Sequence, residues 1–138
     1  MPQPTTRVRP TGHPGYSETL PRDPESAATA RRLVCVALST WGLDELTDDA
    51  VLIVTELVTN AVRHARRRSI RVMVERIAPR TVRVAVADFS HALPVPCAPK
   101  NDEEGGRGLA LVVALATNWG ADERRWGKVV WADLEAPG

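Results

Sequence analysis

One stripe of a predicted helix carries three polar side chains that could do chemistry together: Glu56, Asn60 and Arg63. At about 100° per residue, Asn60 lies about 40° from Glu56 around the helix axis, and Arg63 lies about 20° to the other side. The opposite face is apolar, with Val54 and Leu57 among its residues, so a core could bury it. A general base, a metal-binding carbonyl oxygen and a phosphate-pairing cation on one surface could together handle a magnesium nucleotide.

Two further features of the sequence could bind part of a nucleotide. Asp88 stands at the end of a predicted strand, and the cluster Gly105-Gly106-Arg107-Gly108 leads into a predicted helix that begins at Leu109. Glycines before a helix let the backbone approach a phosphate closely, and the exposed N–H groups and the helix dipole favour an anion. Such glycines can also simply end a loop. The pattern G-x-x-x-x-G-K-[ST] does not occur, which excludes a P-loop.

The predicted elements place these residues in an α+β domain. Two helices come first, from Asp23-Pro24 to about Thr40 and from Thr47 to the basic run at residues 66–68. Two strands with alternating apolar residues follow, at 70–75 and 82–86, and then a long loop at 89–104. A helix at 109–117 and a hairpin at 118–134 complete the chain. This order predicts a two-layer sandwich, with helices on one face of a mixed, mostly antiparallel sheet.

The N-terminal segment and the overall composition restrict the class of protein. Residues 1–22 are rich in Pro, Thr, Gly and Arg, which predicts a flexible arm before a single domain at 23–136. A formal net charge of +1 argues against general binding of nucleic acid or of an anionic membrane. The chain has no apolar run of membrane-spanning length and no secretory signal, so we expect a cytoplasmic protein. Cys35 and Cys97 are separated and not spaced for zinc.

Four segments share their order and spacing with a known set of motifs: Leu52–Ala65, Val86–Asp88, Glu104–Leu109 and Gly127–Leu134. They resemble, respectively, the N box, the first and second glycine boxes and the closing strand of the GHKL (Bergerat-fold) ATP-binding superfamily. Within it, the chain looks most like the small anti-sigma-factor serine/threonine kinases, which contain a histidine kinase-like ATPase domain. The resemblance covers about residues 24–135, and the N box and the second glycine box together are fairly specific.

The resemblance implies a role for each candidate site residue. Asn60 would bind Mg²⁺ through its side-chain oxygen, and Asp88 would accept a hydrogen bond from the adenine amino group of ATP. Glu56 would be the catalytic base that orients or deprotonates the attacking hydroxyl. Arg63 would contact a phosphate. The second glycine box, residues 105–109, would wrap the phosphates, below a lid formed by residues 89–104.

Two departures from the family pattern lie at the adenine end of this predicted site. The first glycine box normally continues as Asp-x-Gly-x-Gly, whereas this chain continues from Asp88 through Phe89 with no glycine at either place. The closing strand usually supplies a threonine near the adenine, and Val129 is expected at that point. Both departures predict weak to moderate ATP binding.

The resemblance also implies a cellular function. The protein would transfer the γ-phosphoryl group of Mg·ATP to a serine of an anti-anti-sigma partner. It would hold a sigma factor inactive, as a homodimer, and release it by partner switching. Two alternatives remain open: a non-catalytic module that binds ATP or a partner, and a phosphatase or ATPase on the same scaffold.

Overall fold

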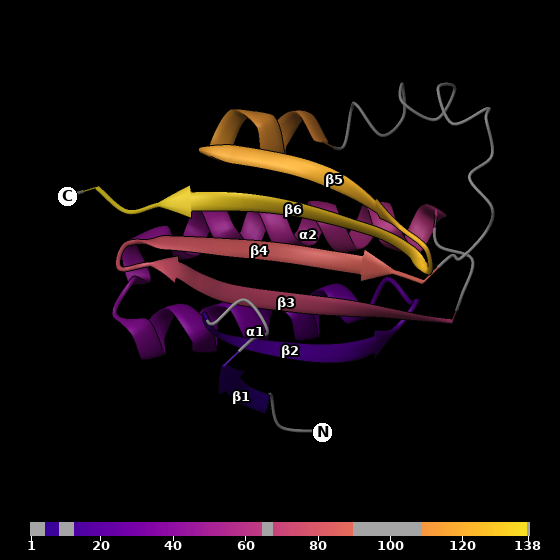
Figure 1. Cartoon of the computed structure of the whole chain (residues 1–138), viewed down its shortest axis with the longest axis horizontal. Coiled ribbons are helices and arrows are strands. Elements are labelled where there is room, and N and C mark those ends of the chain that lie inside the picture. The colour runs from indigo at the N-terminus through magenta and orange to yellow at the C-terminus, as the bar shows by residue number, and fades with distance from the viewer. Residues whose placement is uncertain (1–4, 9–12, 65–67, 90–108, 138) are drawn as a thin grey trace.

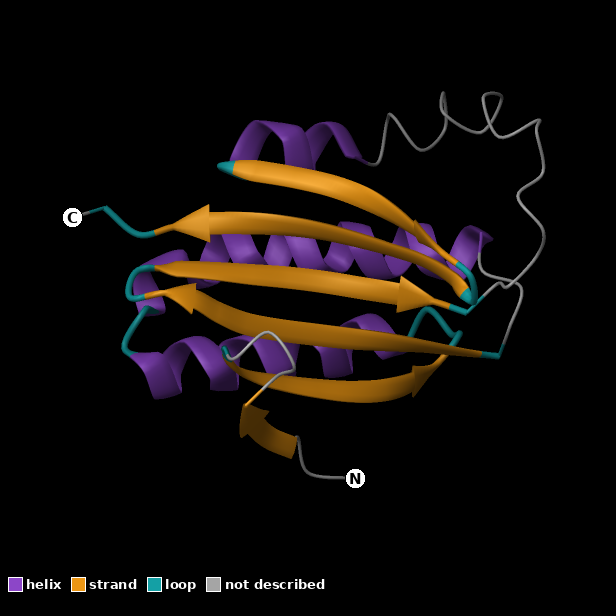
Figure 2. Ribbon diagram, viewed as in Figure 1, coloured by secondary structure: helices purple, strands orange, loops and turns teal. Residues whose placement is uncertain are grey.

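The protein is a two-layer α+β sandwich, seen in a computed structural model that describes residues 5–8, 13–64, 68–89 and 109–137. Six strands form one sheet in the order β1-β2-β3-β4-β6-β5, and every pairing in it is antiparallel. The helices cover one face of this sheet (Figure 1, Figure 2). The elements are β1 Thr5–Val8, β2 Pro14–Pro21, α1 Ser26–Trp41, η1 Asp44–Leu46, α2 Thr47–His64, β3 Ser69–Ala78, β4 Thr81–Asp88, β5 Asn118–Arg124 and β6 Gly127–Glu135, with a further helical segment at 109–115. The predicted fold class is confirmed.

The N-terminal segment differs from its prediction, because residues 14–21 form strand β2 rather than part of a flexible arm. This strand pairs with β3 along its whole length, and Tyr16 and Leu20 are only 8% and 6% exposed. The Tyr16 ring also packs against Trp41 at the end of α1, with 5.7 Å between ring centroids. Two apolar side chains at alternating positions are enough here, because β3 supplies the hydrogen-bonding partner. Residues 1–4 and 9–12 lie outside the described residues.

The two long helices follow their predicted bounds closely. Helix α1 begins at Ser26, slightly after the predicted start, because the Asp23 carboxylate accepts a hydrogen bond from the backbone N–H of Glu25 (2.9 Å) in a turn before the helix. It ends at Trp41, one residue after the predicted end, and is capped by Gly42, whose φ of 69° is left-handed. Helix α2 begins at Thr47 as predicted, directly after η1.

The core lies between the helices and the sheet. Alternate residues of β3 and β4 face the helices and are almost fully buried: Ile70, Val72, Val74, Val82, Val84 and Val86. Helix α1 packs mainly on β2 and β3, while α2 packs mainly on β4. Val112, in the third helical segment, is fully buried in the same core. Burying each such side chain contributes about 1.5–3 kcal/mol, so the two-layer packing dominates the stability of the fold.

The opposite face of the sheet is held by a charged pair beneath an aromatic ring. The Arg83 guanidinium of β4 donates two hydrogen bonds, of 2.7 and 3.0 Å, to the carboxylate of Asp133 on β6. The same guanidinium lies 4.1 Å from the centroid of the Trp131 ring. Hydrogen bonding to Asp133 raises the pKa of Arg83, although burial opposes this shift. The pair thus ties the neighbouring strands β4 and β6 together on the face that the helices leave uncovered.

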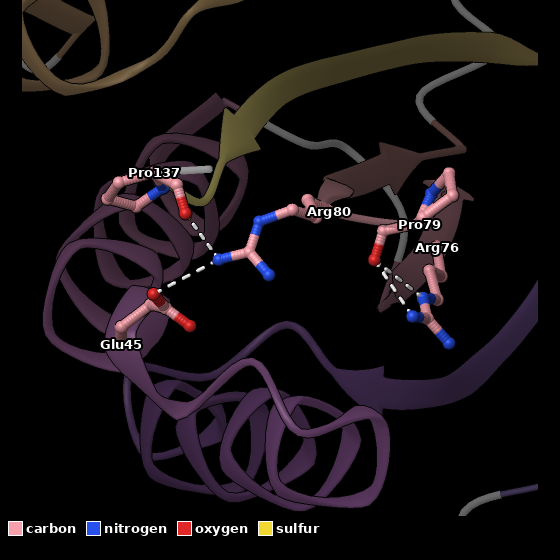
Figure 3. Close-up of polar contacts among 5 residues, drawn as sticks. All are labelled: Glu45, Arg76, Pro79, Arg80 and Pro137. Atoms are coloured by element: carbon pink, nitrogen blue, oxygen red, sulfur yellow. Dashed lines mark hydrogen bonds and ion pairs between the residues drawn. The ribbon is translucent and has the colours of Figure 1, made fainter.

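A second group of polar contacts joins η1, the β3–β4 turn and the segment after β6 (Figure 3). Arg80, in the β3–β4 turn, lies between the Glu45 carboxylate of η1, at 3.3 Å, and the backbone carbonyl of Pro137, to which it donates a hydrogen bond. Both charged side chains are nearly half exposed, at 45% and 46%. Water therefore screens this ion pair, and it contributes less than the Arg83–Asp133 pair.

We expect Asp133→Ala to lower the free energy of unfolding by about 1.5–3 kcal/mol, because it removes two charge-assisted hydrogen bonds from a carboxylate that is 6% exposed. Glu45→Ala is the matched control, since it also removes one carboxylate from an arginine; we expect a loss below about 1 kcal/mol. Urea denaturation followed by circular dichroism measures both. Equal losses in the two variants would contradict the conclusion that the Arg83–Asp133 pair stabilises the fold more than the Arg80–Glu45 pair.

Candidate functional site

Several elements converge at one end of the sheet. In Figure 1 the ends of β2 and β4, the start of β6 and the C-terminal end of α2 all lie on the right of the molecule. The backbone N–H of Arg22, just after β2, donates to the carbonyl of Arg68 (2.6 Å), just before β3. The Arg22 guanidinium also donates to the carbonyl of Val62 in the last turn of α2 (3.2 Å). A cation at this place satisfies a free helix carbonyl and opposes the helix dipole.

The predicted polar stripe lies on α2. Helix α1 contacts α2 at Thr55, whose hydroxyl accepts a hydrogen bond from Arg31 (3.4 Å). At about 100° per residue, Glu56, Asn60 and Arg63 lie about 100°, 140° and 80° around the helix axis from Thr55. Glu56 and Asn60 are half-buried, and Arg63 is exposed. All three side chains are therefore at least partly accessible, as a binding surface requires.

Asp88 is the last residue of β4 and lies on the same face of the sheet as the buried Val86. Asp88 is only 4% exposed, which is rare for an acidic residue. Burying a carboxylate costs free energy unless hydrogen-bonding or charged partners offset the loss of water. Its Cα partners are Ile70 on β3 and Lys128 on β6. An acceptor held this firmly at the edge of the core can select a ligand that offers a donor.

Gly127 lets β6 begin directly against the backbone of Asp88. A Cβ atom at position 127 would lie 2.0 Å from the Asp88 carbonyl oxygen, which no side chain could tolerate without movement of the backbone. Its φ of 158° is also positive. This glycine, which the sequence analysis placed at the start of the closing strand, therefore fixes how closely β4 and β6 approach beside Asp88.

Phe89 directly follows Asp88, and the two positions at which the family pattern has glycine lie outside the described residues. The centroid of the Phe89 ring lies 5.3 Å from that of Trp126, in the turn between β5 and β6, at an angle of 41°. This aromatic contact anchors Phe89, just beyond β4, to the neighbouring hairpin.

The placement of Val129 at the adenine end of the site stays a prediction, although its side chain does not share a face of the sheet with Asp88. In the β4–β6 ladder Val129 is the partner of Ala87, and both residues lie on the face of the sheet away from the helices. The partner of Asp88 is Lys128, whose side chain therefore lies on the helix face. Side chains alternate between faces along a strand, so a shift of one residue in the alignment exchanges the two faces.

The remaining predicted residues have varied outcomes. The loop at 90–104 and the cluster of Gly105, Gly106, Arg107 and Gly108 lie outside the described residues, so their predicted roles stay predictions. Leu109 is described and packs partly buried against the core. Arg22, which the sequence analysis assigned to the arm, lies at the same end of the sheet as the candidate site and was not predicted there. The one feature that could have indicated it is a basic residue directly after β2.

The described residues also bear on metals, membranes and the other reactive side chains. They contain no group of three or more His, Cys, Asp or Glu side chains placed to hold a metal ion. No helix among them has the length and apolar character needed to cross a membrane. The Nε2 atom of His64 is buried with no hydrogen-bonding partner in this part of the chain, as packing of that side chain predicts. Cys35 is an exposed free thiol on α1.

The layered α+β fold carries a polar helix stripe and a buried strand-end carboxylate at one end of its sheet. A family model described as the histidine kinase-like ATPase domain matches residues 20–134. The match covers most of the chain, and the protein belongs to this family, which is part of the GHKL superfamily. The architecture is consistent with the Bergerat fold. A comparison with curated proteins gave no match.

The described residues fit a magnesium nucleotide, which domains of this family generally bind. Asn60 presents an amide oxygen, a ligand type that Mg²⁺ accepts, from a partly exposed position on α2. The buried Asp88 carboxylate is suited to accept from an amino group, and the exposed Arg63 is suited to pair with phosphate.

We expect Gly127→Ala to destabilise the protein more than Gly42→Ala. Both glycines have positive φ, and a left-handed alanine at position 42 costs about 1–2 kcal/mol in otherwise open space. At position 127 the overlap with the Asp88 carbonyl adds about 1–3 kcal/mol. Urea denaturation of the two variants provides the comparison. Equal losses would mean that β6 does not press on Asp88.

Proposed function

We propose that the protein is an anti-sigma-factor-type serine/threonine kinase. It transfers the γ-phosphoryl group of Mg·ATP to a serine of an anti-anti-sigma partner, and it controls a sigma factor by partner switching. One observation carries the proposal: a helix with a partly exposed polar stripe ends at the same end of the sheet as β4, whose last residue is the buried Asp88 (Figure 1). In a chain of the histidine kinase-like ATPase family, a catalytic base, a metal ligand and an acceptor that recognises adenine then act on one nucleotide.

Each proposed role follows from the chemistry of its side chain. Asn60 holds Mg²⁺ through its amide oxygen, and the ion neutralises charge on the phosphates when it is bound. Asp88 accepts from the adenine amino group, while Arg63 pairs with a phosphate. Glu56 orients the serine hydroxyl of the partner and takes its proton as the bond to phosphorus forms.

The partners are proposed from the family resemblance. The sigma factor and the anti-anti-sigma protein compete for the same small domain, and a homodimer is the form that binds the sigma factor. Neither nucleic acid nor a membrane is a direct partner in this scheme.

A second candidate function is favoured by the contact between Phe89 and Trp126. This contact, with 5.3 Å between ring centroids, holds the residue directly after Asp88 against the β5–β6 turn. A domain with a rigid adenine end could bind ATP or a partner as a regulatory module without transferring phosphate. The two candidates differ in one respect only, the dependence of phosphoryl transfer on Glu56.

We expect calorimetry to detect Mg·ATP binding that Asn60→Ala and Asp88→Asn each weaken about 10- to 100-fold, the usual effect of losing a charged hydrogen bond or ligand. Thr59→Ala and Asp122→Asn are the matched controls, because both residues are exposed and lie off the proposed site. They should bind as the wild type does. No binding at millimolar nucleotide would overturn the proposal and leave partner binding alone.

We expect Glu56→Ala to reduce phosphoryl transfer from radiolabelled ATP to a serine-containing partner by about 10²–10⁴-fold, while ATP binding stays unchanged. Thr59→Ala, on the same helix, should transfer phosphate at the wild-type rate. If no labelled protein depends on Glu56, the kinase proposal fails and the regulatory module takes its place. Release of phosphate without any acceptor protein would instead favour an ATPase or phosphatase.

A further inference from the structure

Lys128 shares the helix face of the sheet with Asp88. The two residues are Cα partners in the β4–β6 ladder, so their Cβ atoms lie about 4.5–5.5 Å apart. The next pair on the same face, Val86 and Val130, is 2% and 6% exposed, which identifies this face as the one that the helices cover. Lys128 itself is half-buried at the rim of that face.

The position of this pair is fixed by the backbone around it. Gly127 brings the start of β6 against the Asp88 carbonyl, and the ring contact between Phe89 and Trp126 holds the next residue of the chain. Neither strand end can slide relative to the other without breaking one of these contacts. Asp88 and Lys128 therefore leave the sheet on the same face, at neighbouring positions that the backbone fixes.

Lys128 lies between two acidic residues in the sheet, and Asp88 attracts its ammonium more strongly than the other one does. The other Cα partner of Lys128 is Glu123 on β5, which is exposed, so water screens its attraction. Asp88 is buried and attracts the ammonium through a medium of lower dielectric constant. None of the ion pairs among the described residues involves Lys128.

An ionised carboxylate can only accept hydrogen bonds, and an ammonium can only donate them. The edge of adenine offers the reverse order, since its amino group donates and the adjacent ring nitrogen N1 accepts. We propose that Lys128 donates a hydrogen bond to N1 of the adenine, and so acts as a second base-reading residue beside Asp88. This inference rests on the proposed binding of ATP at the end of β4. It also explains how the adenine end can bind a base without the expected glycines and threonine.

The test compares ATP with 1-deaza-ATP, in which a C–H group replaces N1, by calorimetry with Mg²⁺. We expect the wild type to bind 1-deaza-ATP about 10- to 100-fold more weakly than ATP. Lys128→Met keeps the length of the side chain but loses the donor, so it should bind both nucleotides equally, at the weaker level. Arg125→Met is the matched control, since it removes one exposed charge from the same hairpin; it should discriminate as the wild type does.

Adenosine has no phosphates, so it shows whether Lys128 recognises the adenine or attracts the triphosphate. We expect Lys128→Met to lose the same factor with adenosine as with ATP. If Lys128→Met weakens the binding of ATP but not of adenosine, the ammonium contacts the phosphates and the inference is overturned. Tighter nucleotide binding in the variant would also overturn it. Equal binding of ATP and 1-deaza-ATP by the wild type would overturn it without any variant. ATP binding would still stand in each of these cases, whereas no binding of ATP at all would refute the proposed function itself.

Discussion

The site depends on the close approach of β4 and β6, which Gly127 permits. Because the start of β6 lies against the carbonyl of Asp88, the two strands stay paired up to the last residue of β4. Pairing in turn fixes the face on which each side chain lies. Asp88 is therefore held on the helix face, continuing the row of buried valines, rather than in an irregular loop. This pairing also brings the start of β6 to the end of the sheet where β4 and α2 end (Figure 1).

Strong periodic patterns explain why much of the fold could be predicted. The alternation of Val82, Val84 and Val86 specifies both a strand and its buried face, and the structure buries all three. The helical period of α2 likewise separates Leu57, on the core side, from the stripe with Glu56 and Asn60. Gly42 ends α1 because only a residue without a Cβ adopts its φ of 69° at low cost. These signals are local, so a single sequence carries them in full.

The features that prediction missed are non-local. Strand β2 has few apolar residues, and its stability comes from pairing with β3, more than 50 positions further along the chain, as the Arg71–Ser17 hydrogen bond illustrates. Arg22 gains its place from contacts with Val62 and Arg68, which no local pattern announces. Lys128 was overlooked because motif spacing alone does not fix strand register, and an error of one residue exchanges the faces of the sheet.

The two halves of the site are built under different constraints. Glu56 and Asn60 are half-buried on α2 and lie outside the set of fully buried core residues, so their identities are free to serve chemistry. The adenine end is different, because Asp88, Gly127, Phe89 and Trp126 also hold the sheet together there. Substitution at that end must preserve the packing as well as the recognition of the base. A lysine on β6 meets both demands, since its aliphatic stem can pack at the rim of the core while its ammonium supplies a donor beside Asp88.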